Sequence, residues 1–201
     1  MASPRFFPVP DGLAWIADPE EALQRASVAF TTPDGLVVVD PVDCAGLDER
    51  LGTLGEVTVV LQLLDRHARD CAAVAARHGV AVGRPGLGAS TPGDVRRVSI
   101  AARSRWCEDA LLVRGTGLLV IPEALGSVPL FRAPGEPIGV HPAMRLLPPR
   151  KALAGLRPAV IAFGHGEPLE TDATAALEQA LATSRRRAAR VFLGALRQIR
   201  G

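Results

Sequence analysis

The sequence contains no tyrosine, and aromatic residues make up only 4% of its 201 residues. Proteins that bind single-stranded nucleic acids stack bases on aromatic side chains, so this composition argues against nucleic acid as a partner. The net charge of +2 is also too small to indicate a polyanionic partner. Arginines do crowd the end of the chain, but apolar residues recur among them at helical spacing: Val191, Phe192, Ala195, Leu196 and Ile199. We therefore expect a basic amphipathic helix over about 171–200 that packs on the domain and leaves its arginines in solvent.

Cysteines are also few, and long apolar runs are missing. Cys44, Cys71 and Cys107 are odd in number and form no C-x-x-C pair, which favours reduced thiols over a disulfide framework. Prolines interrupt the first twelve residues, where a signal peptide would need an unbroken apolar segment. No stretch reaches the roughly 18 apolar residues that a membrane span requires. We expect a soluble, cytoplasmic protein with no membrane contact.

The length of 201 residues suits one domain, since single domains commonly hold about 100–200 residues. Apolar, β-branched runs bounded by turn residues predict strands at 13–17, 27–31, 36–39, 57–62, 95–102, 110–114, 118–121 and 159–163. Apolar periodicity predicts helices at 46–53, 69–78, 143–155 (interrupted by Pro148-Pro149) and from 171 onward. The Gly/Pro-rich loop 84–94 divides the two halves. The pattern predicts one α/β domain over 1–201, with helices covering the faces of stacked sheets.

Polar residues follow several of the predicted strands: Asp40, Asp65, His67, Glu123 and His165. Ligands commonly bind at the edge of an α/β sheet where strands end. This edge is the candidate functional site.

Four segments resemble, in order and approximate spacing, the motifs of the metallo-β-lactamase superfamily. They are GLVVVD at 35–40, VVLQLLDRHARD at 59–70, ALLVRGTGLLVIPEAL at 110–125 and IAFGHGEP at 161–168. The second stands where the family carries H-x-H-x-D-H, and the fourth resembles the G-H-G turn that bears the last histidine. The resemblance implies an αββα fold, in which two stacked mixed sheets lie between helices. It also implies a site for one or two Zn or Fe ions that activate water.

The metal-binding motif is largely rewritten. The resemblance places Asp65 at the first histidine, Arg69 at the aspartate that binds a second metal, and Asp70 at the third histidine. His67 and His165 match family histidines, and Glu123 stands at the bridging aspartate. A guanidinium offers no lone pair to a metal, so Arg69 argues against a two-metal centre. We expect Arg69 to pair instead with Asp65, Asp70 or Glu123.

Two principal functions remain open at this point. The first is a catalytically weak or silent member of the fold that uses no cofactor and binds a small anionic ligand or a partner through Arg66 and Arg69. The alternative is a hydrolase of an ester, thioester or phosphoester. It would hold one Zn, Fe or Mn ion through Asp65, His67, Glu123 and His165, with Asp70 or Asp40 as general base or orienting residue.

Three further residues are interpreted as structural. We expect His78 and His141 to be structural or solvated, and Cys107 to be an idle thiol. A metal-free hydrolase with Asp70 and His67 as a base pair has no nucleophile motif to support it.

Overall fold

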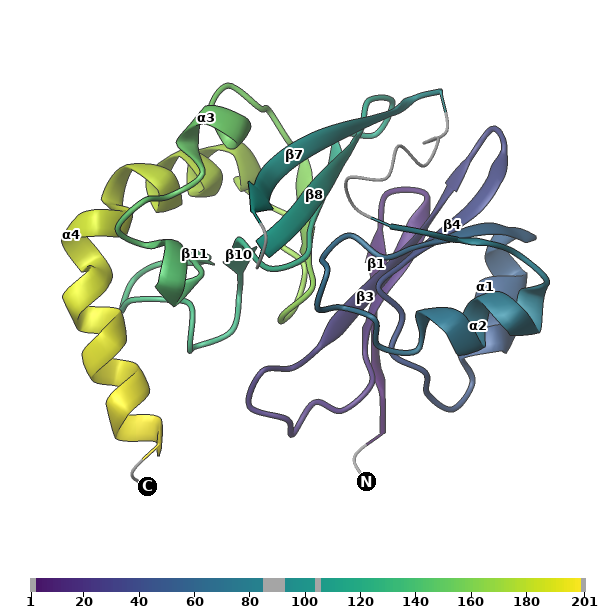
Figure 1. Cartoon of the computed structure of the whole chain (residues 1–201), viewed down its shortest axis with the longest axis horizontal. Coiled ribbons are helices and arrows are strands. Elements are labelled where there is room, and N and C mark those ends of the chain that lie inside the picture. Colours follow the sequence, from purple (N-terminus) through teal and green to yellow (C-terminus); the bar gives the residue numbers. More distant parts are fainter. Residues whose placement is uncertain (1–2, 85–92, 104–105, 200–201) are drawn as a thin grey trace.

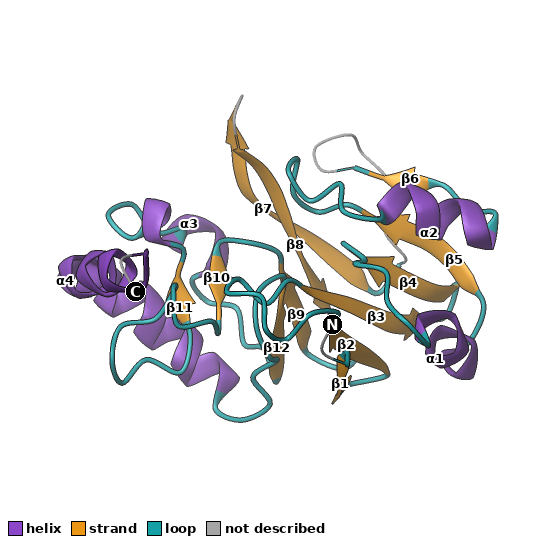
Figure 2. Cartoon of the chain, turned by 90° about the horizontal axis from the view of Figure 1, so that it is seen from below, coloured by secondary structure: helices purple, strands orange, loops and turns teal. Residues whose placement is uncertain are grey.

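The computed structural model describes residues 3–84, 93–103 and 106–199, and the side chains of residues 103 and 193–199 are not described. Most of the predicted loop 84–94 therefore lies outside the described residues. The described chain forms two β-sheets packed face to face, with helices on both outer sides (Figures 1 and 2). This arrangement confirms the predicted αββα sandwich.

The first sheet has six strands whose spatial order follows the sequence. They are β1 (Arg5–Val9), β2 (Gly12–Ile16), β3 (Ala26–Thr32), β4 (Gly35–Val39), β5 (Val57–Leu61) and β6 (Val82–Gly83). The first four are antiparallel, whereas β4, β5 and β6 run parallel. The parallel pairs require crossovers, and helices α1 (Leu47–Leu54) and α2 (Cys71–His78) supply them.

The second sheet has four strands in the order β12 (Val160–Phe163), β9 (Leu118–Ile121), β8 (Trp106–Val113) and β7 (Val95–Arg103). Its outer side carries the 3-10 helix η1 (Pro142–Met144), α3 (Arg150–Leu153) and the long α4 (Ala173–Ile199). A two-stranded ribbon of β10 (Leu125–Gly126) and β11 (Gly139–Val140) lies between this sheet and α4 (Figure 2).

Three apolar layers hold the sandwich together. Phe30, Val37 and Leu111 belong to the layer between the two sheets. Trp15 joins α1 and α2 to the outer face of the first sheet, and Phe163 joins the second sheet to α4. Burial of these faces is the main favourable term in the stability of such a fold.

The structure differs from the sequence prediction at particular elements. Strand β1 was not predicted because it contains Pro8 and is flanked by two further prolines, but β1 is an edge strand, where proline is tolerated. The helix expected at 143–155 is divided into η1 and α3, since Pro148-Pro149 cannot continue a helix. In α4, Val191 is buried as expected but Phe192 is 43% exposed. The side chains of the other three stripe residues, Ala195, Leu196 and Ile199, lie outside the described residues.

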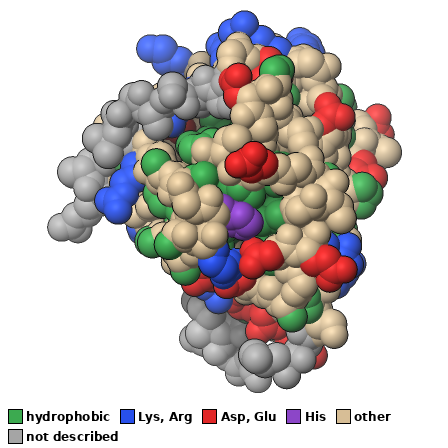
Figure 3. Space-filling model, turned by 90° about the vertical axis from the view of Figure 1, so that its right-hand side faces the viewer, with side chains coloured by type: hydrophobic (Ala, Val, Ile, Leu, Met, Phe, Trp, Pro, Cys, Tyr) green, Lys and Arg blue, Asp and Glu red, His purple; other side chains and the backbone are tan. Residues whose placement is uncertain are grey.

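Surface charge is mixed, in keeping with a net charge of +2. Acidic, basic and apolar side chains are interspersed over the described part of the face shown in Figure 3. In the part of the chain that the structure describes, no helix is both long and apolar enough to cross a membrane.

Candidate metal centre

Three side chains from different parts of the chain meet at the ends of the strands. His67 lies in the loop after β5, Glu123 follows β9 by two residues, and His165 follows β12 by two residues. One ligand atom from each lies within 4.8 Å of the others, and both histidines are buried. The fold thus brings together three of the four residues that the sequence proposed as metal ligands.

The two imidazoles approach the same carboxylate oxygen. Nε2 of His67 lies 2.9 Å from Oε2 of Glu123, and Nε2 of His165 lies 3.0 Å from it. The opposite nitrogens face acceptors: Nδ1 of His67 is 3.0 Å from Oδ2 of Asp40, and Nδ1 of His165 is 3.0 Å from the carbonyl oxygen of Leu23. The hydrogen of each neutral ring therefore belongs on Nδ1, which leaves a lone pair on Nε2. Two lone pairs facing a carboxylate oxygen require a cation between them, either protons or a metal ion.

Glu123 is the electrostatic centre of the cluster. Burial alone would raise its pKa, but hydrogen bonds from His141, His165 and His67 hold the pKa of the carboxyl well below its ordinary range. Burial likewise works to lower the pKa of His67, and the hydrogen bonds to Asp40 and Glu123 outweigh it, so that this pKa is raised. The cluster is built around an ionised Glu123 that attracts positive charge.

His141 completes the surroundings of Glu123. Its Nδ1 accepts a hydrogen bond of 3.2 Å from the amide of Ala143, so its Nε2 carries the hydrogen and donates to Oε1 of Glu123 at 3.2 Å. Its ring lies edge-on to Phe131 and Trp106. We expected a structural or solvated residue here, whereas the structure places His141 against the site. It lies outside the four family-like segments, so only the fold reveals it.

Asp40 orients His67. The carboxylate of Asp40 is buried, and it accepts one hydrogen bond from the amide of Leu63 at 2.8 Å and one from Nδ1 of His67. Its backbone φ of 43° is uncommon for a residue other than glycine. The carboxylate thus fixes the ring on the side facing away from Glu123, as an orienting residue would.

The guanidinium of Arg69 is partly buried, and it binds backbone rather than a carboxylate. Nη1 donates to the carbonyl oxygens of Ala26 and Asp40, and Nη2 donates to that of Gly164 at 2.9 Å. The prediction that Arg69 pairs with an acidic side chain is wrong, because these three carbonyls converge beside it. Its burial lowers the pKa of the guanidinium. Arg69 links the start of β3 to the turns after β4 and β12, next to His165.

The remaining predicted residues lie apart from the cluster. Asp65 is exposed and accepts a hydrogen bond from the amide of Cys107 at 3.1 Å. The carboxylate of Asp70 accepts from the amide of Asp43 at 2.8 Å. The exposed Arg66 places its guanidinium 4.3 Å from the ring centre of Trp106.

Glu108 holds the backbone of Glu123 in place, and nothing in the sequence marks it as a site residue. It is fully buried, and its Oε1 accepts hydrogen bonds from the amides of Glu123 and Ala124 at 2.9 and 2.7 Å. Its Oε2 accepts from the indole of Trp106 at 2.7 Å. Burial raises the pKa of this carboxyl. A glutamate within a strand has no sequence signature for this role, because its partners are backbone amides.

The donor set suits a single metal ion. Two imidazoles and one carboxylate form a known three-ligand set of catalytic zinc sites. Ligating histidines in such sites donate their second N–H to a carboxylate or a carbonyl, as His67 and His165 are placed to do here.

Comparisons with solved structures agree on the fold. The chain is similar to the metallo-β-lactamase TMB-1 (TM-score 0.59, 6% identity, covering 94% of this chain and 100% of that one). It is similar to FIM-1 from Pseudomonas aeruginosa in its mono-zinc form (TM-score 0.56, 8% identity, covering 92% and 96%). It also resembles the apo state of the chemotaxis sensor ODP from T. denticola (TM-score 0.51, 10% identity, covering 92% and 97%). No protein-family model and no curated protein matches the sequence.

Proposed function

We propose that this chain, which has the metallo-β-lactamase fold, is a hydrolase that holds one divalent metal ion through His67, Glu123 and His165. The observation that carries the proposal is the convergence of both Nε2 atoms on Oε2 of Glu123, at 2.9 and 3.0 Å. The substrate class is an ester, thioester or phosphoester. FIM-1, which shares the fold, is known in a mono-zinc form, so the architecture accommodates a single ion.

A bound zinc, iron or manganese ion would supply water activation, because a metal can lower the pKa of bound water from 15.7 to about 7. The protein's own residues provide the rest. Asp40 and the carbonyl of Leu23 fix both imidazoles, and the N–H of His141 fixes the second oxygen of Glu123. These contacts would hold the three ligand side chains in place for an ion.

Arg69 supports one ion rather than two. The resemblance places Arg69 where the family has a ligand of the second metal, and a guanidinium cannot act as a ligand. Its charge, anchored by three carbonyls, would repel a second cation. The proposed centre therefore has one metal ion and a fixed organic cation beside it.

The decisive experiment is metal analysis of protein purified without chelator. We expect about one equivalent of Zn, Fe or Mn, and loss of that metal in His165→Ala. His78→Ala is the matched control, because His78 lies at the end of α2 beside Asp48, outside the cluster. Ester, thioester and phosphoester substrates would then be tested with and without chelator. Metal-free protein that fails to take up any of the three ions, or an activity indifferent to chelator and to His165→Ala, would refute the proposal.

A second candidate is a member of the fold without metal that binds a small anionic ligand or a partner. The distances from the two Nε2 atoms to Oε2 of Glu123 are compatible with this metal-free form. At 2.9 and 3.0 Å they are hydrogen-bond distances, which a proton on each Nε2 would satisfy. ODP, of the same fold, is a chemotaxis sensor, which shows that the architecture is not restricted to lactamases. In this case the purified protein would contain no metal, and Arg66→Ala would weaken binding of the anion.

A further inference from the structure

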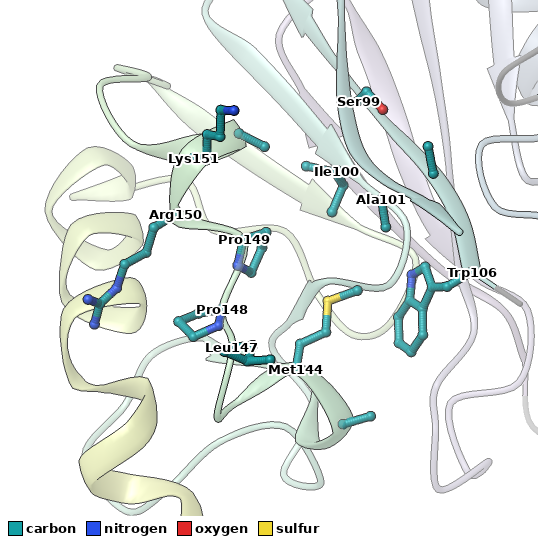
Figure 4. Close-up of a pocket in the computed structure, with 13 residues that line it drawn as sticks. Ser99, Ile100, Ala101, Trp106, Met144, Leu147, Pro148, Pro149, Arg150 and Lys151 are labelled. Atoms are coloured by element: carbon teal, nitrogen blue, oxygen red, sulfur yellow. The ribbon is translucent and has the colours of Figure 1, made fainter. Parts of the chain in front are cut away.

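A groove of about 670 Å³ lies between β7 and the segment from η1 to α3, with Trp106 at one end (Figure 4). One wall is β7, with Ile100 and Ala101. The other is the segment from η1 to α3, with Met144, Leu147 and Pro149. The volume falls within the roughly 300–1,000 Å³ that is usual for small-molecule sites, whose walls are mostly apolar. The volume suits a small molecule rather than a folded partner, and the apolar side chains of both walls suit an apolar group.

The groove leads to the cluster through two aromatic rings. Trp106 lines it, and the Trp106 ring centre lies 5.1 Å from that of His141. Ala143, also in the wall, donates its amide hydrogen to Nδ1 of His141, whose Nε2 contacts Glu123. A group that fills the groove up to Trp106 is therefore separated from the Glu123 carboxylate by the side chains of Trp106 and His141.

The end at Trp106 is firmly held. The indole N–H donates to the buried Glu108 at 2.7 Å, and the Arg66 guanidinium covers the ring at 4.3 Å. Glu108 also binds the amide of Glu123. The buried carboxylate of Glu108 thus holds both Trp106, at the end of the groove, and the backbone of Glu123. The distance between these two residues is therefore fixed by the fold.

We infer that the groove binds the apolar acyl group of the substrate, with the ester or thioester bond at the Trp106–His141 end. The assignment to a substrate rests on the proposed hydrolase function, whereas binding of an apolar chain does not. Each CH₂ buried contributes about 0.8 kcal/mol, which corresponds to roughly a fourfold gain in affinity. Phosphoesters without an apolar group would gain nothing from this groove.

The test uses straight-chain carboxylates of four to ten carbons, titrated while tryptophan fluorescence is recorded. Trp15 is fully buried in the core, so Trp106 reports on the groove, and Trp106→Phe verifies the source of the signal. We expect Kd to fall about fourfold per CH₂ until the groove is full, on the order of 200-fold from four to eight carbons. The same trend should appear in kcat/KM for acyl thioesters.

Neighbouring leucines provide a matched pair of variants. Leu147 lines the groove and is 70% exposed, whereas Leu146 does not line it and is 60% exposed. Neither is a core residue, so both variants should fold. Leu147→Asp should abolish the dependence on chain length, and Leu146→Asp should retain it. Equal behaviour of the two variants, or binding that ignores chain length, would overturn the assignment.

The two proposals fail separately. Length-dependent binding in chelator-treated protein, with no turnover of any ester by the metal-loaded protein, would uphold the groove and refute the hydrolase. Metal-dependent hydrolysis with neither chain-length dependence nor carboxylate binding would uphold the hydrolase and refute the groove.

Discussion

Replacing Arg69 by methionine tests whether this side chain joins the strand ends. Methionine keeps much of the apolar stem but removes the donors to the carbonyls of Ala26, Asp40 and Gly164. A hydrogen bond involving a charged group contributes about 1.5–3 kcal/mol. Three such bonds would suggest a large loss, but two opposing effects reduce it.

The first is that two of the carbonyls keep another donor. The carbonyl of Asp40 also accepts from the Ser27 hydroxyl at 2.8 Å, and that of Gly164 accepts from the Ala26 amide at 2.8 Å. The second is that removal of the partly buried guanidinium recovers part of the cost of taking a charge out of water, which reaches several kcal/mol for a fully buried ion. We expect Arg69→Met to lower the free energy of unfolding by about 2–3 kcal/mol, and Tm by roughly 5–10 °C.

Thermal unfolding followed by circular dichroism measures this effect, with Arg77→Met as the control. Arg77 is an arginine on the surface of α2, 36% exposed, that pairs with Asp43 and Asp48. Exposed ion pairs contribute about 0–1 kcal/mol, so the control should stay close to the parent protein. If the two variants unfold at the same temperature, Arg69 does not join the strand ends as described.

Three further predictions follow from the same contacts. Asp40→Asn should weaken zinc binding 10- to 100-fold, because Asp40 orients His67, whereas Asp70→Asn should leave it unchanged; calorimetric titration measures both. Arg145→Met should cost about 3 kcal/mol in urea unfolding, since it leaves the buried carboxylate of Glu136 with only the more distant ion pair to Arg187 at 3.8 Å. Burial works to raise the pKa of Glu136, but the hydrogen bonds from Arg145 and the Ala133 amide, together with the charges of Arg145 and Arg187, lower this pKa, so Glu136 stabilises the fold at neutral pH. That contribution should decline as the pH falls below the ordinary glutamate value of about 4.3, and the decline should be smaller in stability curves of Arg145→Met.

Much of the fold could be predicted because its signals are local. The apolar run at 36–39 forms β4, and Gly79 ends α2 with a left-handed φ of 68°, as the sequence indicates. The order of the four family-like segments allowed the αββα arrangement to be predicted. It also indicated that His67, Glu123 and His165 would lie close together. Spacing along the chain was sufficient, since each of these residues follows a strand.

The parts of the site that were missed depend on non-local partners. Arg69 binds backbone carbonyls, and Glu108 binds backbone amides. Every residue carries such groups, so no residue type marks them in advance. His141 reaches Glu123 from a loop outside any motif. Charge reasoning alone assigned Arg69 an acidic partner, whereas the fold supplies three aligned carbonyl oxygens.

The order of the three cluster residues along the chain constrains when the site can form during synthesis. His67 belongs to the first sheet's half of the chain, Glu123 follows β9, and His165 follows β12, which pairs in parallel with β9. A ribosome-bound chain from which β12 has not yet emerged has only two members of the cluster. It also lacks the hydrogen bond from Arg69 to the carbonyl of Gly164, which links the two sheets. An ion held by these three residues, as proposed, would bind only after β12 has joined the second sheet, and a truncation before residue 165 should yield a chain unable to retain it.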